Sequence, residues 1–432
     1  MSFDLALDLF PLLAATLAAV CCGVLGNFLL LRKQSMMGDA ISHSVLPGLV
    51  IAFLIVSARS PMVMLTGATI AGIVTVVLVE FVKRVGKVEP GAAMGVVFSI
   101  LFALGVLLIE KAAVRHVDLD ADCVLHGQLE TLVWYSAPNS IAGLWSMETI
   151  HAVPRQVTTL AVMLAFTVAF VSALFKELRI AAFDPALATT LGFNSTALHY
   201  VLMVFVAAAT VASFEAVGSI LVIAMLICPP ATARLLTDRL ISQLLISVLV
   251  AICTAVGGYF AATIIPGWFD RDTVNAAGSM TVFAGFVLVL AIVLSPSHGV
   301  LSRIIRRVRL ASRVAMDDLL AAIYRSHEQG HAGIPAQQIA ETRRGSSPKP
   351  VLARSMRKGY ITLTDGNYVL SDQGRRIAKD LVRRHRLWEH YLVGEAGIAP
   401  DHVHETAERL EHLPSSPPTG PDIDPHGKQI PE

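Results

Sequence analysis

The chain has 432 residues, of which 54% are hydrophobic and 16% are charged, and its formal net charge is +1. This charge points to no class of partner, and the five cysteines show neither a disulfide framework nor a zinc-ligand spacing. Hydropathy divides the chain near Ser302, because apolar runs dominate before it and charge and proline dominate after it. We therefore predict a polytopic membrane domain over residues 1–302, followed by a soluble part.

The membrane domain contains nine apolar segments, most of them close to the length of about 20 residues that spans a bilayer. They are Phe10–Leu31, Asp39–Ser57, Met62–Val82, Ala92–Ile109, Val157–Phe175, Leu198–Ala212, Val217–Leu235, Ile241–Ile265 and Ser279–Leu294. The sixth is short, and the sixth and seventh are predicted to form a broken pair. If all nine cross, the basic residues favour one side, which places the C-terminus in the cytoplasm and the N-terminus outside.

The start of the second segment carries a carboxylate and an imidazole one helical turn apart. Asp39 and His43 are spaced i,i+4 and share a helix face, so both side chains can reach the same small volume. Ionisable groups at membrane depth indicate a functional site, and this pair suits a divalent transition metal. The alternative is a helix-entry cap with a satisfied histidine at the membrane edge.

Two other polar features of the membrane domain have open interpretations. The loop Glu110–Pro154 is predicted to be external, and its acidic and histidine residues either attract arriving cations or form a solvated face. These residues are His116, Asp118, Asp120, Asp122 and His126. Glu215, between the sixth and seventh segments, either lines a path or caps a helix.

The segment Lys176–Leu191 is amphipathic and too short to cross a membrane. Asp184 and Pro185 are typical of a helix start, and Gly192 is typical of the position just past a helix end. A short cytosolic helix between two spans suits the docking of another subunit. The alternative is an ordinary connecting loop.

Several stretches resemble the permease subunits of bacterial ABC transporters for manganese, zinc and iron. They are GNFLLLRKQSMMGDAISHSVLPG, EPGAAMGVVFSILFALGVLLI, FDPALATTLGF and AVGSILVIAMLICPPATARLL. The resemblance covers about 300 residues and implies a homo- or heterodimeric permease in the inner membrane, served by an extracytoplasmic metal-binding protein. It also implies that Asp39 and His43 line the metal path, and that a separate ATPase docks at Phe183, Asp184, Pro185, Ala188, Leu191 and Gly192. No GxxxxGK[ST] motif occurs, so the ATP chemistry is expected in that partner and not in this chain.

The soluble part begins with a basic linker, residues 303–316, which fits either membrane lipid headgroups or a simple connection. Residues 317–375 are then predicted to form a winged helix. Its expected elements are the helices Asp317–His327, Ile334–Arg343 and Lys349–Lys358 and the strands Tyr360–Leu363 and Tyr368–Leu370, which flank an Asp365-Gly366 turn. Such a fold can bind DNA, and the basic face would comprise Lys349, Arg354, Arg357 and Lys358.

Residues 376–413 combine histidines and carboxylates at helical spacing. His385 and Glu389 are i,i+4 on one predicted helix, and a second predicted helix carries further groups. These are His404, Glu408, Glu411 and His412. Such groups suit a divalent-metal cluster, whereas a charged surface helix explains only some of them.

Residues from about Val314 to His412, with an echo in DPHGKQIP, resemble the iron-dependent repressors of diphtheria-toxin-repressor type. The resemblance implies metal ligands at His385, Glu389, His404, Glu408, Glu411 and His412, with Asp318 from the first helix. It also implies that Glu408 favours manganese. Departures from the family are Ala321, Pro350 within the expected recognition helix, and a flexible proline-rich tail over residues 414–432.

Taken together, the sequence predicts an all-α polytopic membrane protein of about eight or nine spans with a C-terminal winged-helix and helical metal-binding domain. We expect a permease subunit of an ABC importer for manganese, zinc or iron, whose cytosolic tail senses the metal and damps transport. One alternative is a membrane-tethered, metal-dependent transcriptional regulator, against which Pro350 argues. Another is an exporter or a metal-insensitive permease with a vestigial tail.

Overall fold

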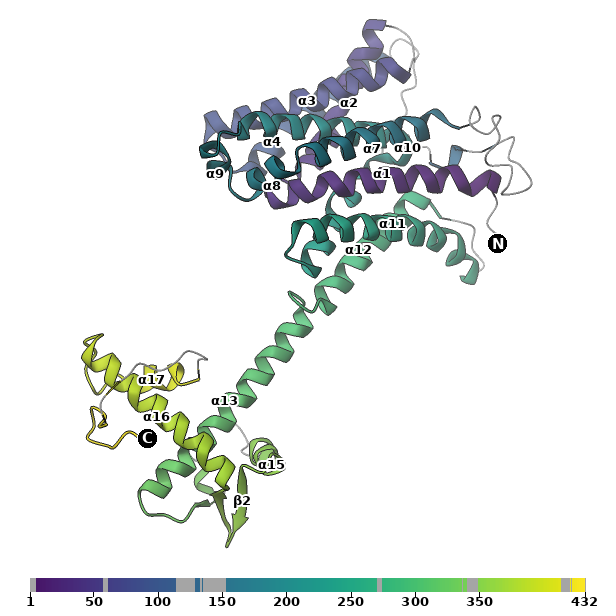
Figure 1. The fold of residues 1–432 in the computed structure, drawn as a ribbon. Coiled ribbons are helices and arrows are strands. Elements are labelled where there is room, and N and C mark those ends of the chain that lie inside the picture. The colour runs from purple at the N-terminus through teal and green to yellow at the C-terminus, as the bar shows by residue number, and fades with distance from the viewer. Residues whose placement is uncertain are drawn as a thin grey trace. The chain divides into compact units, whose positions relative to one another are not determined.

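The computed structural model describes residues 5–56, 61–113, 129–132, 134, 153–269, 274–335, 337–339, 349–412, 420 and 422–431. The chain divides into two compact units, Met1–Ser302 and Arg303–Glu432, in agreement with the change in hydropathy at Ser302. Figure 1 shows the helices of both units. The residues of the predicted external cation cluster, 116–126, lie outside the described part of the chain.

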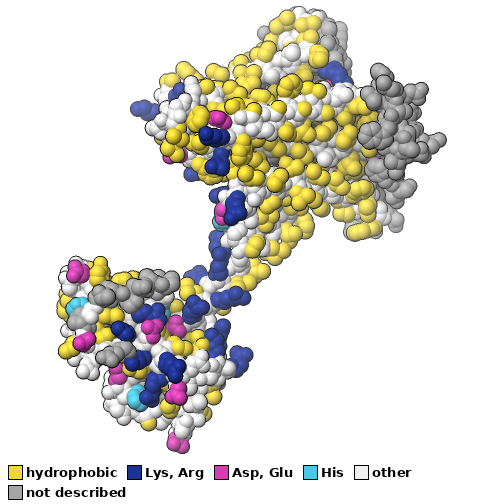
Figure 2. Space-filling model, viewed as in Figure 1, with side chains coloured by type: hydrophobic (Ala, Val, Ile, Leu, Met, Phe, Trp, Pro, Cys, Tyr) yellow, Lys and Arg dark blue, Asp and Glu magenta, His cyan; other side chains and the backbone are white. Residues whose placement is uncertain are grey.

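The first unit is a bundle of helices, which confirms the predicted polytopic helical fold. Its elements are α1 (Leu5–Leu31), α2 (Met37–Val56), α3 (Pro61–Gly86), α4 (Pro90–Ala113), α7 (Arg155–Ala173), α8 (Phe175–Phe183), α9 (Pro185–Thr190), α10 (Ser195–Leu236), α11 (Leu240–Ile264) and α12 (Ala276–Leu294), with short 3-10 turns at Leu129–Thr131 and Pro266–Phe269. In the described part of the chain, eight helices are long and apolar enough to cross a membrane. Figure 2 shows hydrophobic side chains across the surface of this unit, as expected where lipid replaces water.

Small residues and a few buried polar contacts hold the bundle together. A Cβ on Gly48 of α2 would lie 2.4 Å from the backbone oxygen of Gly67 on α3, so only glycine permits this approach. Gln243 of α11 donates a hydrogen bond of 2.9 Å to the side-chain oxygen of Asn27 on α1, and both residues are fully buried. Polar partners of this kind are needed inside a membrane bundle, where water is absent.

The helix α10 is broken at Gly218 and returns to the end of the bundle from which it starts. Gly218 has φ 77° and ψ 169°, a conformation that L side chains rarely adopt. Before the break, His199 contacts Arg32 at the end of α1, with 3.0 Å between Nδ1 and Nη1. After the break, Leu226 packs so closely on Gly26, near that same end, that a Cβ there would lie 2.1 Å from its backbone oxygen. The predicted sixth and seventh spans are therefore two arms of one re-entrant helix.

The second unit combines helices with a small antiparallel sheet. Its elements are α13 (Val300–Glu328), β1 (Ile334–Pro335), α15 (Lys349–Arg357), β2 (Ile361–Thr364), β3 (Asn367–Leu370), α16 (Asp372–Gly394) and α17 (His404–Leu410). The strand order is β1-β3-β2. Asp365 and Gly366 both have positive φ, 52° and 80°, as a two-residue hairpin turn requires, so the predicted hairpin is confirmed.

Three local expectations for this unit differ from the structure. The basic linker is helical and belongs to α13, and Ile334–Pro335 pairs with β3 as a strand where a helix was expected. Pro350 is the second residue of α15, within the first turn, where its missing N–H would have no helical partner in any case. The proline therefore does not break this helix, and the reason for doubting it as a recognition helix is removed.

The C-terminal segment 422–431 is built around a buried aspartate. Oδ1 of Asp424 accepts hydrogen bonds from the backbone N–H groups of His426 (2.9 Å) and Lys428 (2.8 Å). Arg386 of α16 lies 3.6 Å from Asp424 and donates a hydrogen bond to the backbone oxygen of Gln429. The described end of the proline-rich tail is thus fastened to α16 instead of extending freely.

Candidate metal centres

The first candidate site is the Asp39–His43 pair near the start of α2. Nε2 of His43 lies 3.4 Å from Oδ1 of Asp39, and the two side chains are 34% and 27% exposed. The imidazole ring packs against Phe98 and Phe102 of α4, with ring centroids 5.6 and 5.8 Å away. The i,i+4 spacing therefore brings both ligand atoms together. Among the described residues, no third histidine, cysteine, aspartate or glutamate completes a group of three with them.

The predicted docking segment is two short helices that meet at Asp184. Oδ1 of Asp184 accepts hydrogen bonds of 3.0 Å from the N–H groups of both Ala186 and Leu187, so this residue caps α9. Pro185 is the first residue of α9, and Gly192 follows its end with φ 87°. The expected start and end of the helix are found, while Lys176–Phe183 belongs to a separate helix, α8.

The segment around α9 presents an apolar face at the surface. Phe183, Leu187 and Leu191 are 57%, 49% and 56% exposed, whereas Ala188 is fully buried and anchors the helix to the bundle. Three large exposed apolar side chains grouped on a segment too short to cross a membrane are typical of an interaction surface.

The second candidate site lies in the second unit, between α16 and α17. Nε2 of His385 is 3.1 Å from Oε1 of Glu389 and 3.0 Å from Nδ1 of His404, and His404 is itself 3.0 Å from Glu389. Nδ1 of His385 makes a short hydrogen bond with Glu411. His385, Glu389 and Glu411 are each at most 3% exposed. Three ligand atoms therefore converge, two of them from buried side chains and the third from His404, whose side chain is 60% exposed.

A second group of three adjoins the first through Glu411. Nε2 of His412 lies 3.2 Å from Asp318 of α13 and 3.7 Å from Oε1 of Glu411, while Nδ1 lies 3.7 Å from Asp317. The carboxylates of Asp317 and Asp318 raise the pKa of His412 to about 10. Glu411 faces one group with each of its oxygens, so it connects the two.

The charges of the first group are set by the same contacts. Burial raises the pKa of Glu389, but hydrogen bonds from His385 and His404 outweigh it and hold this pKa at about 2. Burial also lowers the pKa of His385, yet its bonds to Glu389 and Glu411 leave that pKa above the ordinary value. Without a metal, Glu389 therefore stays ionised and favours a protonated His385 beside it.

The chemistry of these side chains fits a divalent metal. Both ring nitrogens of His412 are buried, and in the described part of the chain their neighbours are the carboxylates of Asp317, Asp318 and Glu411. An imidazole surrounded by carboxylates is a ligand set for a divalent cation, which would take the place of the imidazole proton. Mixed nitrogen and oxygen ligands suit manganese, iron and zinc alike.

The structure places one predicted ligand outside both groups and brings one further histidine close to the first group. Glu408 is exposed on α17 and belongs to neither group, because α17 ends at Leu410 and the following turn carries Glu411 and His412 inward. His426, which sequence analysis did not select, brings Nε2 to 3.9 Å from Glu389. Its only signal in the sequence was the DPHGKQIP stretch that resembled the repressors.

The fold and these sites agree with what comparison with protein families finds. The ABC 3 transport family matches residues 9–135 and 148–295, and the chain belongs to this family of multi-pass membrane permeases. The metal binding and dimerisation domain of iron dependent repressors matches residues 371–417, which include the first group of ligands.

Individual relatives extend this assignment. The manganese transport system membrane protein MntD of Bacillus subtilis (strain 168) is 39% identical over 294 residues, 68% of this chain and 94% of the relative. The zinc transport system membrane protein TroD of Treponema pallidum (strain Nichols) is 34% identical over 380 residues, 85% of this chain and 96% of its own. Among solved structures, PsaBC from Streptococcus pneumoniae in complex with Fab has a TM-score of 0.53 at 26% identity, covering 67% of this chain and 92% of that one.

Proposed function

We propose that the protein is the permease subunit of a manganese or zinc ABC importer, with Asp39 and His43 as ligands in its transport path. The observation that carries this proposal is the 3.4 Å pair at the start of a membrane helix in a member of this transport family. Relatives that carry manganese or zinc in their names support these two ions as cargo, and iron remains compatible with the same ligands.

A two-ligand site suits an ion that must leave again. One carboxylate and one imidazole leave the other coordination positions to water or to a second permease subunit, so the ion is held briefly. A closed four-ligand site, as structural zinc uses, would retain it. The partly exposed side chains of the pair and the aromatic wall formed by Phe98 and Phe102 are consistent with a narrow, hydrated passage.

The bundle end that carries the basic residues is the cytoplasmic one in this proposal. Arg32, Lys83 and Arg84 lie at the ends of α1 and α3, and the α9 segment lies near them, lining one cavity through Pro185. The positive-inside rule assigns such an end to the cytoplasm. The exposed side chains of Phe183, Leu187 and Leu191 then face the compartment that holds the ATPase, and we infer that they dock it.

Metal uptake by whole cells tests the path ligands. Asp39→Ala and His43→Ala should each reduce uptake of manganese or zinc to background, while the protein still inserts and assembles with its ATPase. A matched control exists in Asp238→Asn and His298→Gln, which alter another aspartate–histidine contact (3.8 Å) in the same unit. Normal uptake by both path variants, with the control also normal, would exclude the pair as path ligands.

For the tail, we propose that the two groups around Glu411 bind cytosolic metal and slow transport when the metal is plentiful. Supporting observations are the convergence of six ligand side chains, the shared carboxylate of Glu411 and the repressor-type family match. Metal binding changes transport only if two states of the tail differ in metal affinity. The carboxylate of Glu411, shared by both groups, would couple them, because filling one group changes the charge that the other experiences.

A transport assay with the complete protein tests the sensor. Uptake should slow as internal metal rises, and a Glu389→Ala, His412→Ala double variant should lose this brake while basal uptake persists. Glu405→Gln is the matched control, since Glu405 is an exposed carboxylate of α17 paired with Arg409 outside both groups. If the double variant responds to internal metal as the unaltered protein does, the tail is not the sensor.

DNA binding is a second candidate role for the tail, because α15 begins at Lys349 and tolerates Pro350 in its first turn. Arg357 and Lys358 are exposed near its end and would contact phosphate groups. Salt-dependent retention of the complete protein on duplex DNA, lost in an Arg357→Gln, Lys358→Gln variant, would support this role, and retention that is equal for both proteins would oppose it.

A further inference from the structure

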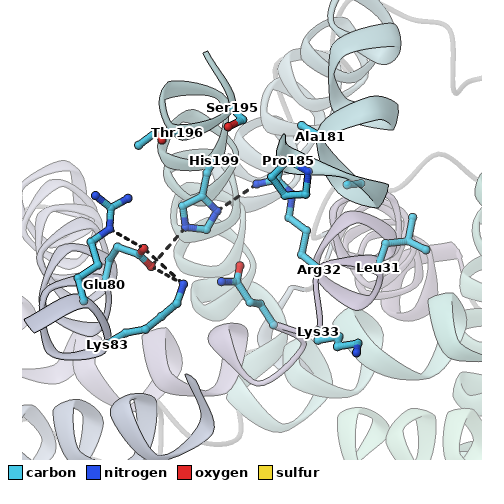
Figure 3. Close-up of a pocket in the computed structure, with 13 residues that line it drawn as sticks. Leu31, Arg32, Lys33, Glu80, Lys83, Ala181, Pro185, Ser195, Thr196 and His199 are labelled. Atoms are coloured by element: carbon cyan, nitrogen blue, oxygen red, sulfur yellow. Dashed lines mark hydrogen bonds and ion pairs between the residues drawn. The ribbon is translucent and has the colours of Figure 1, made fainter. Parts of the chain in front are cut away.

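A cavity of about 370 Å³ opens at the end of the membrane bundle where α1 and α3 end and α10 begins, beside α8 and α9 (Figure 3). Four cationic side chains line it, Arg32, Lys33, Lys83 and Arg84, together with one carboxylate, Glu80. The volume falls in the range of small-molecule sites. Neither the metal path nor the docking surface accounts for a cavity with this charge.

The carboxylate of Glu80 already accepts hydrogen bonds from two of the basic side chains. Glu80 accepts from Nζ of Lys83 at 3.1 Å and from Nε of Arg84 at 3.0 Å, and Nε2 of His199 lies 3.8 Å away. The Glu80 side chain is only 7% exposed, so it forms part of the wall. One negative charge faces four positive charges, and the cavity is left strongly electropositive.

On the other side of the cavity, two buried polar atoms lack hydrogen-bond partners within the described structure, one of them a donor of Arg32. Nη1 of Arg32 contacts Nδ1 of His199, which must act as acceptor because a guanidinium can only donate. Nε of Arg32 is buried and makes no hydrogen bond within the described structure. The amide of Gln34, a residue that is 7% exposed, also has its oxygen buried without a partner. A ligand with several acceptor oxygens would satisfy the buried guanidinium.

We propose that this cavity binds a phosphate group, carried either by an anionic phospholipid or by a soluble phosphate compound. Phosphate offers oxygens to an arginine fork and to lysines together. The first residues of α10, Ser195 and Thr196, also line the cavity and bring hydroxyl groups at a helix N-terminus. The apolar spans of α1 and α3 end here, at Leu31 and Gly86, so the cavity lies at the depth of lipid headgroups.

Binding measurements on the full-length protein in detergent test this proposal. The probes are phosphatidylglycerol, phosphatidylcholine as the zwitterionic lipid, and inorganic pyrophosphate. Arg32→Gln should weaken binding of the anionic probe about tenfold, the effect of one charge-assisted hydrogen bond. Glu80→Gln should strengthen binding, because it removes the only carboxylate of the wall. Opposite signs separate a lost ligand contact from damage to the fold, which would weaken binding in both variants.

The matched control is Lys176→Gln with Arg239→Gln, which removes two basic residues at the same bundle end outside the cavity and should leave binding unchanged. Binding of phosphatidylglycerol alone would identify a lipid headgroup, and equal binding of pyrophosphate would identify a soluble phosphate compound; both support the proposal. It is overturned if wild-type protein binds neither anion more tightly than phosphatidylcholine. It is also overturned if Arg32→Gln abolishes only ATPase association, because the cavity then receives a protein carboxylate.

Discussion

The two candidate metal sites of this chain contrast in number of ligands and in exposure. The Asp39–His43 pair in the membrane unit has two ligand atoms 3.4 Å apart, with about a third of each side chain open. In the second unit, His385 and Glu389 are 3% exposed and belong to a group of three, which a second group adjoins. Under the proposed function, the contrast teaches that a carboxylate and an imidazole alone and partly exposed would let an ion pass, whereas more ligands, most of them buried, would retain it.

We call the Asp39–His43 pair the open site and the two groups around Glu411 the closed site. The largest effect should come from adding a ligand to the open site, so that it resembles the closed site. Phe98 packs 5.6 Å from the ring of His43, so Phe98→His brings a third ligand to the pair. Release of the ion should slow, and uptake should fall at least about tenfold while metal co-purifies with the protein. Elemental analysis and uptake together measure this. Phe98→Leu is the control with normal uptake, and rapid uptake by Phe98→His without retained metal would contradict the contrast.

Opening the closed site should cost folding stability. His385→Ala removes the buried imidazole that joins the carboxylates of Glu389 and Glu411, and leaves each of them beside another histidine, His404 or His412. Loss of one member of a buried pair costs about 3–5 kcal/mol. Hydrogen exchange in α16 of the metal-free protein measures this loss, and Arg409→Gln, an exposed change on α17, serves as control. A loss below about 1 kcal/mol would mean that the cluster is not a coupled unit.

The pH dependence of the closed site should identify His412. Its pKa in the folded protein is about 10, above the ordinary value of 6.5, so its ion pairs stabilise the metal-free fold fully below about pH 6.5. That contribution should be lost as the pH rises toward 10. Thermal unfolding between these values should show the decline, and His412→Gln should flatten it. A metal that displaces the proton should also bind more tightly as the pH rises.

The smallest effect is expected at Glu408, which is exposed and outside both groups. Glu408→Gln should change metal affinity less than about threefold, while Glu411→Gln, which removes the shared carboxylate, should change it at least about tenfold. Calorimetric titration of the full-length protein measures both. Equal losses in the two variants would return Glu408 to the ligand set that the repressor resemblance implied.

Features that depend on neighbouring residues could be predicted from the sequence, because their causes are local. The hairpin at Asp365-Gly366 follows from two residues that tolerate positive φ, and the start of α9 follows from the capping side chain of Asp184. The re-entrant path of α10 was not predicted in this form. Hydropathy records that both arms are apolar, but only the contacts of α10 with Arg32 and Gly26 reveal its return.

The same distinction applies to the closed site. His385 and Glu389 meet because they are i,i+4 on one helix, which the sequence displays directly. His426 lies near Glu389 because the contact between Asp424 and Arg386 holds the C-terminal segment against α16. This contact joins residues that are far apart in the chain, so no local sequence pattern predicts it. Glu408 was selected by its spacing on a predicted helix and by family resemblance, whereas its orientation depends on where α17 ends.

The break at Gly218 has a consequence for topology. Since α10 starts and ends at the same end of the bundle, it does not count as a crossing of the membrane. The other helices alone therefore determine whether the two chain ends of the membrane unit lie on the same side or on opposite sides. Removing all of α10 would preserve the sidedness of α11 and α12. Removing one arm, or straightening the helix through Gly218, would invert them. A single left-handed glycine thus decides on which side of the membrane the following 130-residue unit is delivered.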